Sequence, residues 1–345
     1  EGSREDNQWC ALGSVKSQMG HAKAAAGAAG LFKAVMALHH KVLPPTIKVE
    51  RPNPKLEIEK SPFYLNTQRR PWIRDSAHPR RASVSSFGFG GSNFHVAIEE
   101  YVPSSDSGKR AWKIRTAPTE LLLISAASPS ELVAKCRDMA SAKKDLSHLA
   151  RETQLSFSAK APARLAVVTK ASELAQKLNQ AADTIEKAPE KSYTTPFGVH
   201  YAAGNGDPGQ VAFLFPGQGS QYVGMGAEVA MSIDGARAAW DAAADLPFGG
   251  ERLHNVVFPT PVFSDQDRDG QQKKLTATEW AQPALGVHSQ SMANVLHSIG
   301  VRPSCVAGHS FGEISALHEA GVIDAATAVK IARRRGELMR DASSV

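Results

Sequence analysis

The order of apolar and polar residues predicts short strands that alternate with amphipathic helices in the middle of the chain. Three apolar runs fit strands, at 120–126, 163–169 and 198–202. Helical patterns lie between them, at 129–142, 145–157 and 171–188. Because the strand–helix–helix–strand–helix–strand order has short connections, we predict a small α/β domain over residues 119–208.

The first hundred residues predict a different arrangement. We expect a strand at 9–15 and a helix at 22–40, which the two prolines at 44–45 terminate. The high density of Ala and Gly indicates that this helix packs closely against another backbone. Residues 81–99 predict two strands around a Gly-rich hairpin at 87–91.

The sharpest local signal is the sequence Gly308-His309-Ser310-Phe311-Gly312. An apolar run at 303–307 predicts a strand and residues 311–320 predict a helix, so Ser310 lies where a strand leads into a helix. Flanking glycines permit a sharp turn that exposes the serine hydroxyl, and the first amides of the helix can stabilise an oxyanion beside it. Ser310 is therefore a candidate nucleophile; a Gly-rich turn without catalytic role is the alternative.

Composition and charge narrow the class of protein. The 345 residues leave room for two to three domains. The net charge of +6 is dispersed, without a basic stripe that carries interleaved aromatics, so we expect no nucleic-acid partner. Three distant cysteines, Cys10, Cys136 and Cys305, favour a reducing compartment and oppose a metal site. No apolar run is long enough to span a membrane and the first residues do not resemble a signal peptide, so we expect a soluble cytoplasmic protein.

Three N-terminal motifs resemble the C-terminal part of a β-ketoacyl synthase of the multidomain type. They are KSQMGHAKAAAGAAG from residue 16, LPPTIKVERPNP from residue 43 and SSFGFGGSNFHVAIEEY from residue 85. The resemblance implies a partial thiolase-like fold over residues 1–101 and a parent that is a homodimer through the ketosynthase. Gln18 replaces the commoner asparagine, and polyunsaturated fatty acid synthases resemble the chain better there.

The same resemblance implies three site residues. His21 would donate a hydrogen bond to the thioester carbonyl while the extender decarboxylates, and Lys16 would support the site electrostatically. Phe89 would act as a gate, with its backbone amide helping to bind the oxyanion. The family's cysteine nucleophile lies upstream of these motifs, and the sequence starts about fifteen residues before Lys16. We therefore expect this part to be unable to condense alone, with Cys10 a buried core residue.

Residues 102–118 are polar, basic and rich in Ser and Pro, which predicts a linker. The α/β domain that follows resembles the linker domain between ketosynthase and acyltransferase in fatty acid and polyketide synthases. This implies a structural spacer. His148 and Cys136 are isolated there, and a surface or core position is the better interpretation of each.

The region 209–345 resembles the N-terminal part of a malonyl-type acyltransferase, with a partial α/β-hydrolase-like fold. The matching stretches are VAFLFPGQGSQYVGMG from residue 211, WAQPAL from residue 280 and the segment 308–339. A phosphate-binding loop is a weak alternative for the first stretch, because no Gly-Lys-Ser/Thr follows. The resemblance implies that Ser310 takes malonyl from malonyl-CoA and passes it to the phosphopantetheine thiol of an acyl carrier protein domain.

Further roles follow from this resemblance. The backbone amides of Gln218 and Phe311 would bind the oxyanion, and Gln282 would lie near the pocket. Arg335 would hold the free carboxylate of malonyl and reject acetyl groups, which would leave it unpaired. Arg333 and Arg334 lie about 200° and 100° around the helix from Arg335, so we expect both to be solvated.

The acyltransferase also needs a base for its serine, and the family's histidine lies well downstream of the arginine. His309 cannot replace it, because neighbouring side chains at the turn point apart. We therefore expect both catalytic domains to be incomplete and the chain to be inactive. Missing partners should expose the apolar faces of the helices at 22–40 and 280–299.

The sequence thus indicates a segment of a multidomain fatty acid or polyketide synthase, most like polyunsaturated fatty acid synthases, with no bound cofactor or metal. Modular or iterative polyketide synthases are the main alternative. A non-catalytic scaffold is a second one. A serine esterase is a third, although it would need a histidine after Ser310, and His318 lies only two helical turns on.

Overall fold

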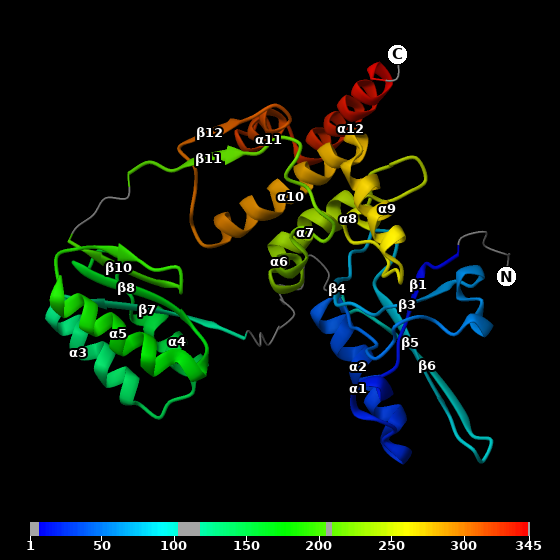
Figure 1. The fold of residues 1–345 in the computed structure, drawn as a ribbon, viewed down its shortest axis with the longest axis horizontal. Coiled ribbons are helices and arrows are strands. Elements are labelled where there is room, and N and C mark those ends of the chain that lie inside the picture. The colour runs from blue at the N-terminus through cyan, green and yellow to red at the C-terminus, as the bar shows by residue number, and fades with distance from the viewer. Residues whose placement is uncertain (1–6, 103–117, 205–208, 344–345) are drawn as a thin grey trace. The chain divides into compact units, whose positions relative to one another are not determined.

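The computed structural model describes residues 7–102, 118–204 and 209–343. Most of the predicted linker at 102–118 therefore lies outside the described residues. The chain forms two compact units, one made of Glu1–Lys113 with Gln210–Val345 and the other of Ile114–Gly209 (Figure 1). Across the described ranges, no helix has both the length and the apolar character that a membrane crossing requires.

The unit from Ile114 to Gly209 has an antiparallel sheet in the order β7-β8-β10-β9. Its strands are β7 (Glu120–Ala126), β8 (Ala163–Thr169), β9 (Tyr193–Thr194) and β10 (Val199–Ala203). Its helices are α3 (Pro129–Ser141), α4 (Leu146–Ser156) and α5 (Leu174–Lys187), with α3 and α5 packed side by side (Figure 1). The predicted elements are present; the two-residue β9 was not predicted.

Local sequence explains the helix starts in this unit. The Ser128 side chain accepts a hydrogen bond from the Glu131 N–H, and Pro129 occupies the first turn of α3. Asp145 accepts from the Ser147 and His148 amides and so caps α4. Cys136 is fully buried, which confirms the predicted core position, and burial raises the pKa of its thiol to about 12.

The N-terminal part of the other unit contains short strand pairs and a long hairpin. Its strands are β1 (Cys10–Leu12), β2 (Val42–Leu43), β3 (Phe63–Leu65), β4 (Arg70–Pro71), β5 (Arg81–Phe87) and β6 (Asn93–Glu99). β1 pairs in parallel with β3, β2 pairs antiparallel with β4, and β5 and β6 form the predicted hairpin. β1 is shorter than the strand predicted at 9–15.

Helices α1 (Lys16–Met19) and α2 (Ala26–His40) complete this part. A Cβ atom on Gly27 would lie only 2.8 Å from the Ser86 hydroxyl oxygen, and one on Gly30 would lie 3.2 Å from a methyl carbon of Val84. The predicted close packing of the small-residue helix, here against β5, is confirmed. Its other face is open, since Phe32 is 67% exposed.

The C-terminal part places one long helix, α10, among shorter ones. The helices are α6 (Ala227–Ser232), α7 (Asp234–Ala243), α8 (Leu253–Val257), α9 (Asp265–Thr276), α10 (Thr278–Ser298), α11 (Gly312–Glu319) and α12 (Ala325–Ala342). α10 packs against α7 and α12, and its residues from Trp280 to Val287 are buried. The expectation that this helix exposes an apolar face was therefore wrong, because α7 and α12 of the same chain cover it.

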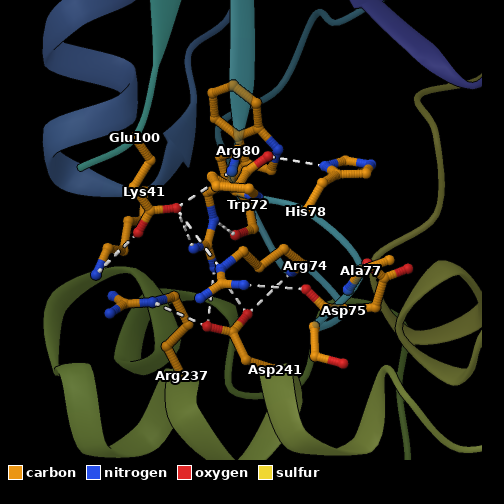
Figure 2. A network of polar contacts seen from close by, with 12 residues as sticks. Lys41, Trp72, Arg74, Asp75, Ala77, His78, Arg80, Glu100, Arg237 and Asp241 are labelled. Atoms are coloured by element: carbon orange, nitrogen blue, oxygen red, sulfur yellow. Dashed lines mark hydrogen bonds and ion pairs between the residues drawn. The ribbon is translucent and has the colours of Figure 1, made fainter. Parts of the chain in front are cut away.

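A buried ion-pair network connects the N-terminal part to α7 (Figure 2). The Arg80 side chain is 1% exposed and pairs with Glu100 at 2.8 Å and with Asp241 at 2.8 Å. Its Nε donates to the Trp72 carbonyl, and Arg237 lies on the other side of Asp241. Two segments 161 residues apart in the sequence are thus held together by a charge cluster in the interior.

Candidate active site

Ser310 occupies a strained turn between β12 (Cys305–Gly308) and α11. Its φ angle is +54°, in the left-handed region that a serine enters only at a cost. A Cβ on Gly308 would lie 2.1 Å from the Gly312 carbonyl carbon, and one on Gly312 would lie 2.1 Å from the Phe215 oxygen. The motif needs both glycines because the backbone folds on itself there, and Ser310 is left exposed.

The loop after β11 (Ala212–Phe215) lies beside this turn. β11 and β12 are parallel, with Phe215 opposite Gly308, so the segments that follow both strands leave the same edge. A Cβ on Gly217 would lie 2.9 Å from the His309 oxygen and 3.5 Å from Cβ of Ser310. The loop that carries Gln218 is therefore in contact with the serine turn.

Two backbone N–H groups near this turn are unpaired among the described residues. Within the described ranges, neither the Gln218 nor the Phe311 backbone N–H has a hydrogen-bond partner. Phe311 precedes the first turn of α11, where the helix dipole favours negative charge. Its ring is buried and lies 3.3 Å from where a Cβ on Gly286 would be, so packing against α10 fixes the amide.

Arg335 approaches this site from α12. It is half-buried, and its Nη1 donates to Oε1 of the fully buried Gln282 at 2.8 Å. Gln282 Nε2 donates to the Thr278 hydroxyl at 2.7 Å, and that hydroxyl is 2.9 Å from Oε1 of Gln218. The structure thus connects Gln218, Gln282 and Arg335, which the sequence identified separately, through one threonine that it did not identify.

Arg333 corrects a sequence prediction, because it is not solvated. Pro283 lies inside α10 and has no N–H to donate to the Glu279 carbonyl four residues back. Arg333 Nη1 donates to that carbonyl at 2.9 Å instead, and its guanidinium lies 4.5 Å from the centroid of the Trp280 ring. Arg334, with a side chain 67% exposed, is solvated as predicted.

Two histidines of the C-terminal part, His297 and His318, bond to groups other than Ser310. His318 Nδ1 donates to the Ile323 carbonyl at 3.0 Å, and His297 Nε2 lies 2.7 Å from Glu319. Among the hydrogen bonds of the described residues, none joins an imidazole to the Ser310 hydroxyl. This arrangement does not supply the Ser–His pair that a serine esterase requires.

The residues implied for condensation lie in the N-terminal part. Lys16 begins α1 and is exposed, and Phe89 lies fully exposed in the hairpin loop between β5 and β6. His21 Nδ1 accepts a hydrogen bond from the Lys23 N–H at 3.0 Å, so the neutral ring carries its proton on Nε2. That tautomer can donate outward. Cys10 is half-buried rather than fully buried, and burial raises the pKa of its thiol.

Comparison with known proteins identifies three domain families along the chain. Residues 212–345 match the acyl transferase domain family. Residues 1–50 match the C-terminal domain of β-ketoacyl synthases, and residues 52–168 match the ketoacyl-synthetase C-terminal extension.

Two curated relatives cover almost the whole chain. A polyunsaturated fatty acid synthase polypeptide of Thraustochytrium sp. is 34% identical over 95% of the chain and 13% of its own length. The phenolphthiocerol synthesis polyketide synthase Pks15/1 of Mycobacterium marinum is 33% identical over 95% of the chain and 15% of its own length. The chain therefore spans about one seventh of the length of these relatives.

A solved structure supports the fold. The acyl transferase domain of ZmaA superposes with a TM-score of 0.56 and 27% identity, over 65% of this chain and 49% of that one.

Proposed function

The chain belongs to the multidomain fatty acid and polyketide synthases that combine a ketosynthase with an acyltransferase, and we propose that it transfers a malonyl-type acyl group through Ser310. The observation that carries the proposal is the position of Ser310. It lies at a left-handed turn against the Gln218 loop, while the Arg335–Gln282 pair links to the same loop through Thr278.

The proposed transfer has two steps. Ser310 Oγ loses its proton and attacks the thioester carbonyl of malonyl-CoA, the amides of Gln218 and Phe311 stabilise the oxyanion, and the C–S bond breaks so that coenzyme A leaves as a thiol with that proton. The phosphopantetheine thiol of an acyl carrier protein then attacks the serine ester, and its proton passes to the departing oxygen, which restores the Ser310 hydroxyl. Arg335 pairs with the malonyl carboxylate throughout both steps.

The transfer also requires a base that removes the proton of the Ser310 hydroxyl. Because no imidazole bonds to the Ser310 hydroxyl within the described ranges, we infer that the chain alone acylates slowly or not at all. From the family resemblance, we also propose that the condensing site of the parent synthase contains Lys16, His21 and Phe89. We propose that this parent is a homodimer. A carrier protein and malonyl-CoA are the proposed partners.

Substrate recognition can be tested without chemistry. In a Ser310→Ala background, Arg335→Ala should weaken malonyl-CoA binding about 10- to 100-fold, since a charge-assisted pair is lost. Acetyl-CoA binding should not change. Arg334→Ala is the matched control, because it removes the same charge from the exposed face of the same helix. Calorimetry that gives equal malonyl-CoA affinities for the two variants would contradict the proposal.

A further inference from the structure

We propose that Thr278 is a positioning residue through which the carboxylate-binding Arg335 also orders the oxyanion loop beside Ser310. The inference rests on the function proposed above and extends it to specificity. It starts from a continuous chain of hydrogen bonds, Arg335–Gln282–Thr278–Gln218, which we call the relay.

The arginine fixes the direction of the first two bonds in the relay. A guanidinium has only donors, so the Gln282 atom 2.8 Å from Nη1 must be the carbonyl oxygen. The amide group of Gln282 then faces Thr278 at 2.7 Å and the sulfur of Met339 at 3.3 Å, and both its hydrogens have acceptors. Because Gln282 is fully buried, the reversed amide would leave an unsatisfied group in the interior.

Thr278 connects Gln282 to the loop that carries Gln218. Its hydroxyl accepts from Gln282 and donates its single hydrogen to Oε1 of Gln218, 2.9 Å away. Gln218 is otherwise exposed, and this bond fixes the orientation of its side chain. Valine has the shape of threonine but no hydroxyl, so it would break the relay at one atom.

Backbone packing holds Thr278 in place. A Cβ on Gly336 would lie 2.5 Å from the Thr278 carbonyl oxygen and 2.6 Å from Cα of Glu279. α12 can therefore approach the start of α10 only because the residue after Arg335 is glycine. The contact at Gly336 therefore holds the arginine and the threonine together, and Gln218 is the exposed end of the relay.

This geometry couples recognition to the reaction. When a malonyl carboxylate immobilises Arg335, the relay becomes more rigid and the Gln218 loop with it. An acetyl group has no carboxylate to bind the arginine, so it should affect the loop only through its own contact with the Gln218 amide. Thr278 therefore contributes to the preference for dicarboxylic acyl groups without contacting substrate.

Amide hydrogen exchange of the loop at 217–220 tests the proposal on the full chain in a Ser310→Ala background. Without ligand, Thr278→Val should increase loop exchange about 5-fold, the expected effect of one lost hydrogen bond, and Thr278→Ser should not. Thr276→Val is the matched control. Thr276 lies two residues before Thr278, but its hydroxyl donates to the Gln272 carbonyl and takes no part in the relay. Equal exchange in the two valine variants would overturn the inference.

A second arm separates this inference from the proposed function. Malonyl-CoA should protect the loop more than acetyl-CoA does in the Ser310→Ala protein and in its Thr278→Ser variant, and this difference should be lost in Thr278→Val. A difference that persists in Thr278→Val would overturn the coupling. If malonyl-CoA does not bind the Ser310→Ala protein at all, the proposed function is wrong. The ligand-free comparison of the variants still decides whether the relay orders the loop.

Discussion

Replacement of Arg80 by methionine should destabilise the unit that contains both termini. Arg80 donates to two carboxylates in the interior, Glu100 and Asp241, and to the Trp72 carbonyl (Figure 2). Methionine preserves much of the side-chain volume but leaves both carboxylates without their main partner.

The magnitude follows from what remains after the substitution. Removal of one partner of a buried ion pair costs about 3–5 kcal/mol. Glu100 keeps Lys41 at 3.4 Å and Asp241 keeps Arg237 at 3.7 Å, so we expect the lower end, about 3 kcal/mol. At 25 °C this corresponds to about a 100-fold change in the unfolding equilibrium.

Tryptophan fluorescence during denaturant unfolding measures this loss in the correct unit. Residues 114–209 contain no tryptophan, and Trp72, Trp240 and Trp280 lie in the unit that contains Arg80, so the signal of these three reports on that unit. Arg81→Met is the matched control, since Arg81 pairs with Glu99 at the surface and should lose less than about 1 kcal/mol. Equal unfolding free energies for the two variants would refute the role assigned to the network.

Two further predictions concern pH and packing. Burial alone would raise the pKa of Glu100, but the hydrogen bonds and charge of Arg80 and the charge of Lys41 outweigh it and lower that pKa. The ionised Glu100 carboxylate should therefore stabilise the folded state above about pH 4.3, and this stabilisation should be lost as the pH falls through the lowered folded-state pKa. Glu100→Gln should flatten this pH dependence in acid unfolding curves. Gly336→Ala should separate α12 from α10 and weaken malonyl-CoA binding as much as Arg335→Ala does. Gly270→Ala, on the open surface of α9, is the control and should leave the malonyl-CoA affinity measured by calorimetry unchanged. Unchanged binding in Gly336→Ala would contradict the close approach.

Local features were predicted well because their causes are local. The turn at Ser310 follows from two glycines between an apolar run and a helical pattern, and the structure has a sharp turn there with Ser310 at a positive φ. Helix α5 (Leu174–Lys187) follows from apolar spacing. The two-residue β9 has no periodicity to detect.

Long-range polar contacts were not predictable in the same way. Gln218 and Thr278 are 60 residues apart, and Arg80 and Asp241 are 161 apart, so nothing local marks either pair. Thr278 had one usable signal, its position four residues before Gln282 on the same helix face. Arg333 was misjudged from helix geometry alone, because the carbonyl that Pro283 leaves free belongs to another helix.

The most direct test of the central claim is the intact mass of the chain after incubation with malonyl-CoA, with and without added imidazole as an external base. We predict one malonyl adduct on Ser310 that forms slowly or not at all alone, faster with imidazole, and never in Ser310→Ala. An adduct that persists in Ser310→Ala, or no adduct even with imidazole, would contradict the assignment of Ser310. Rapid labelling without imidazole would contradict the absence of a base.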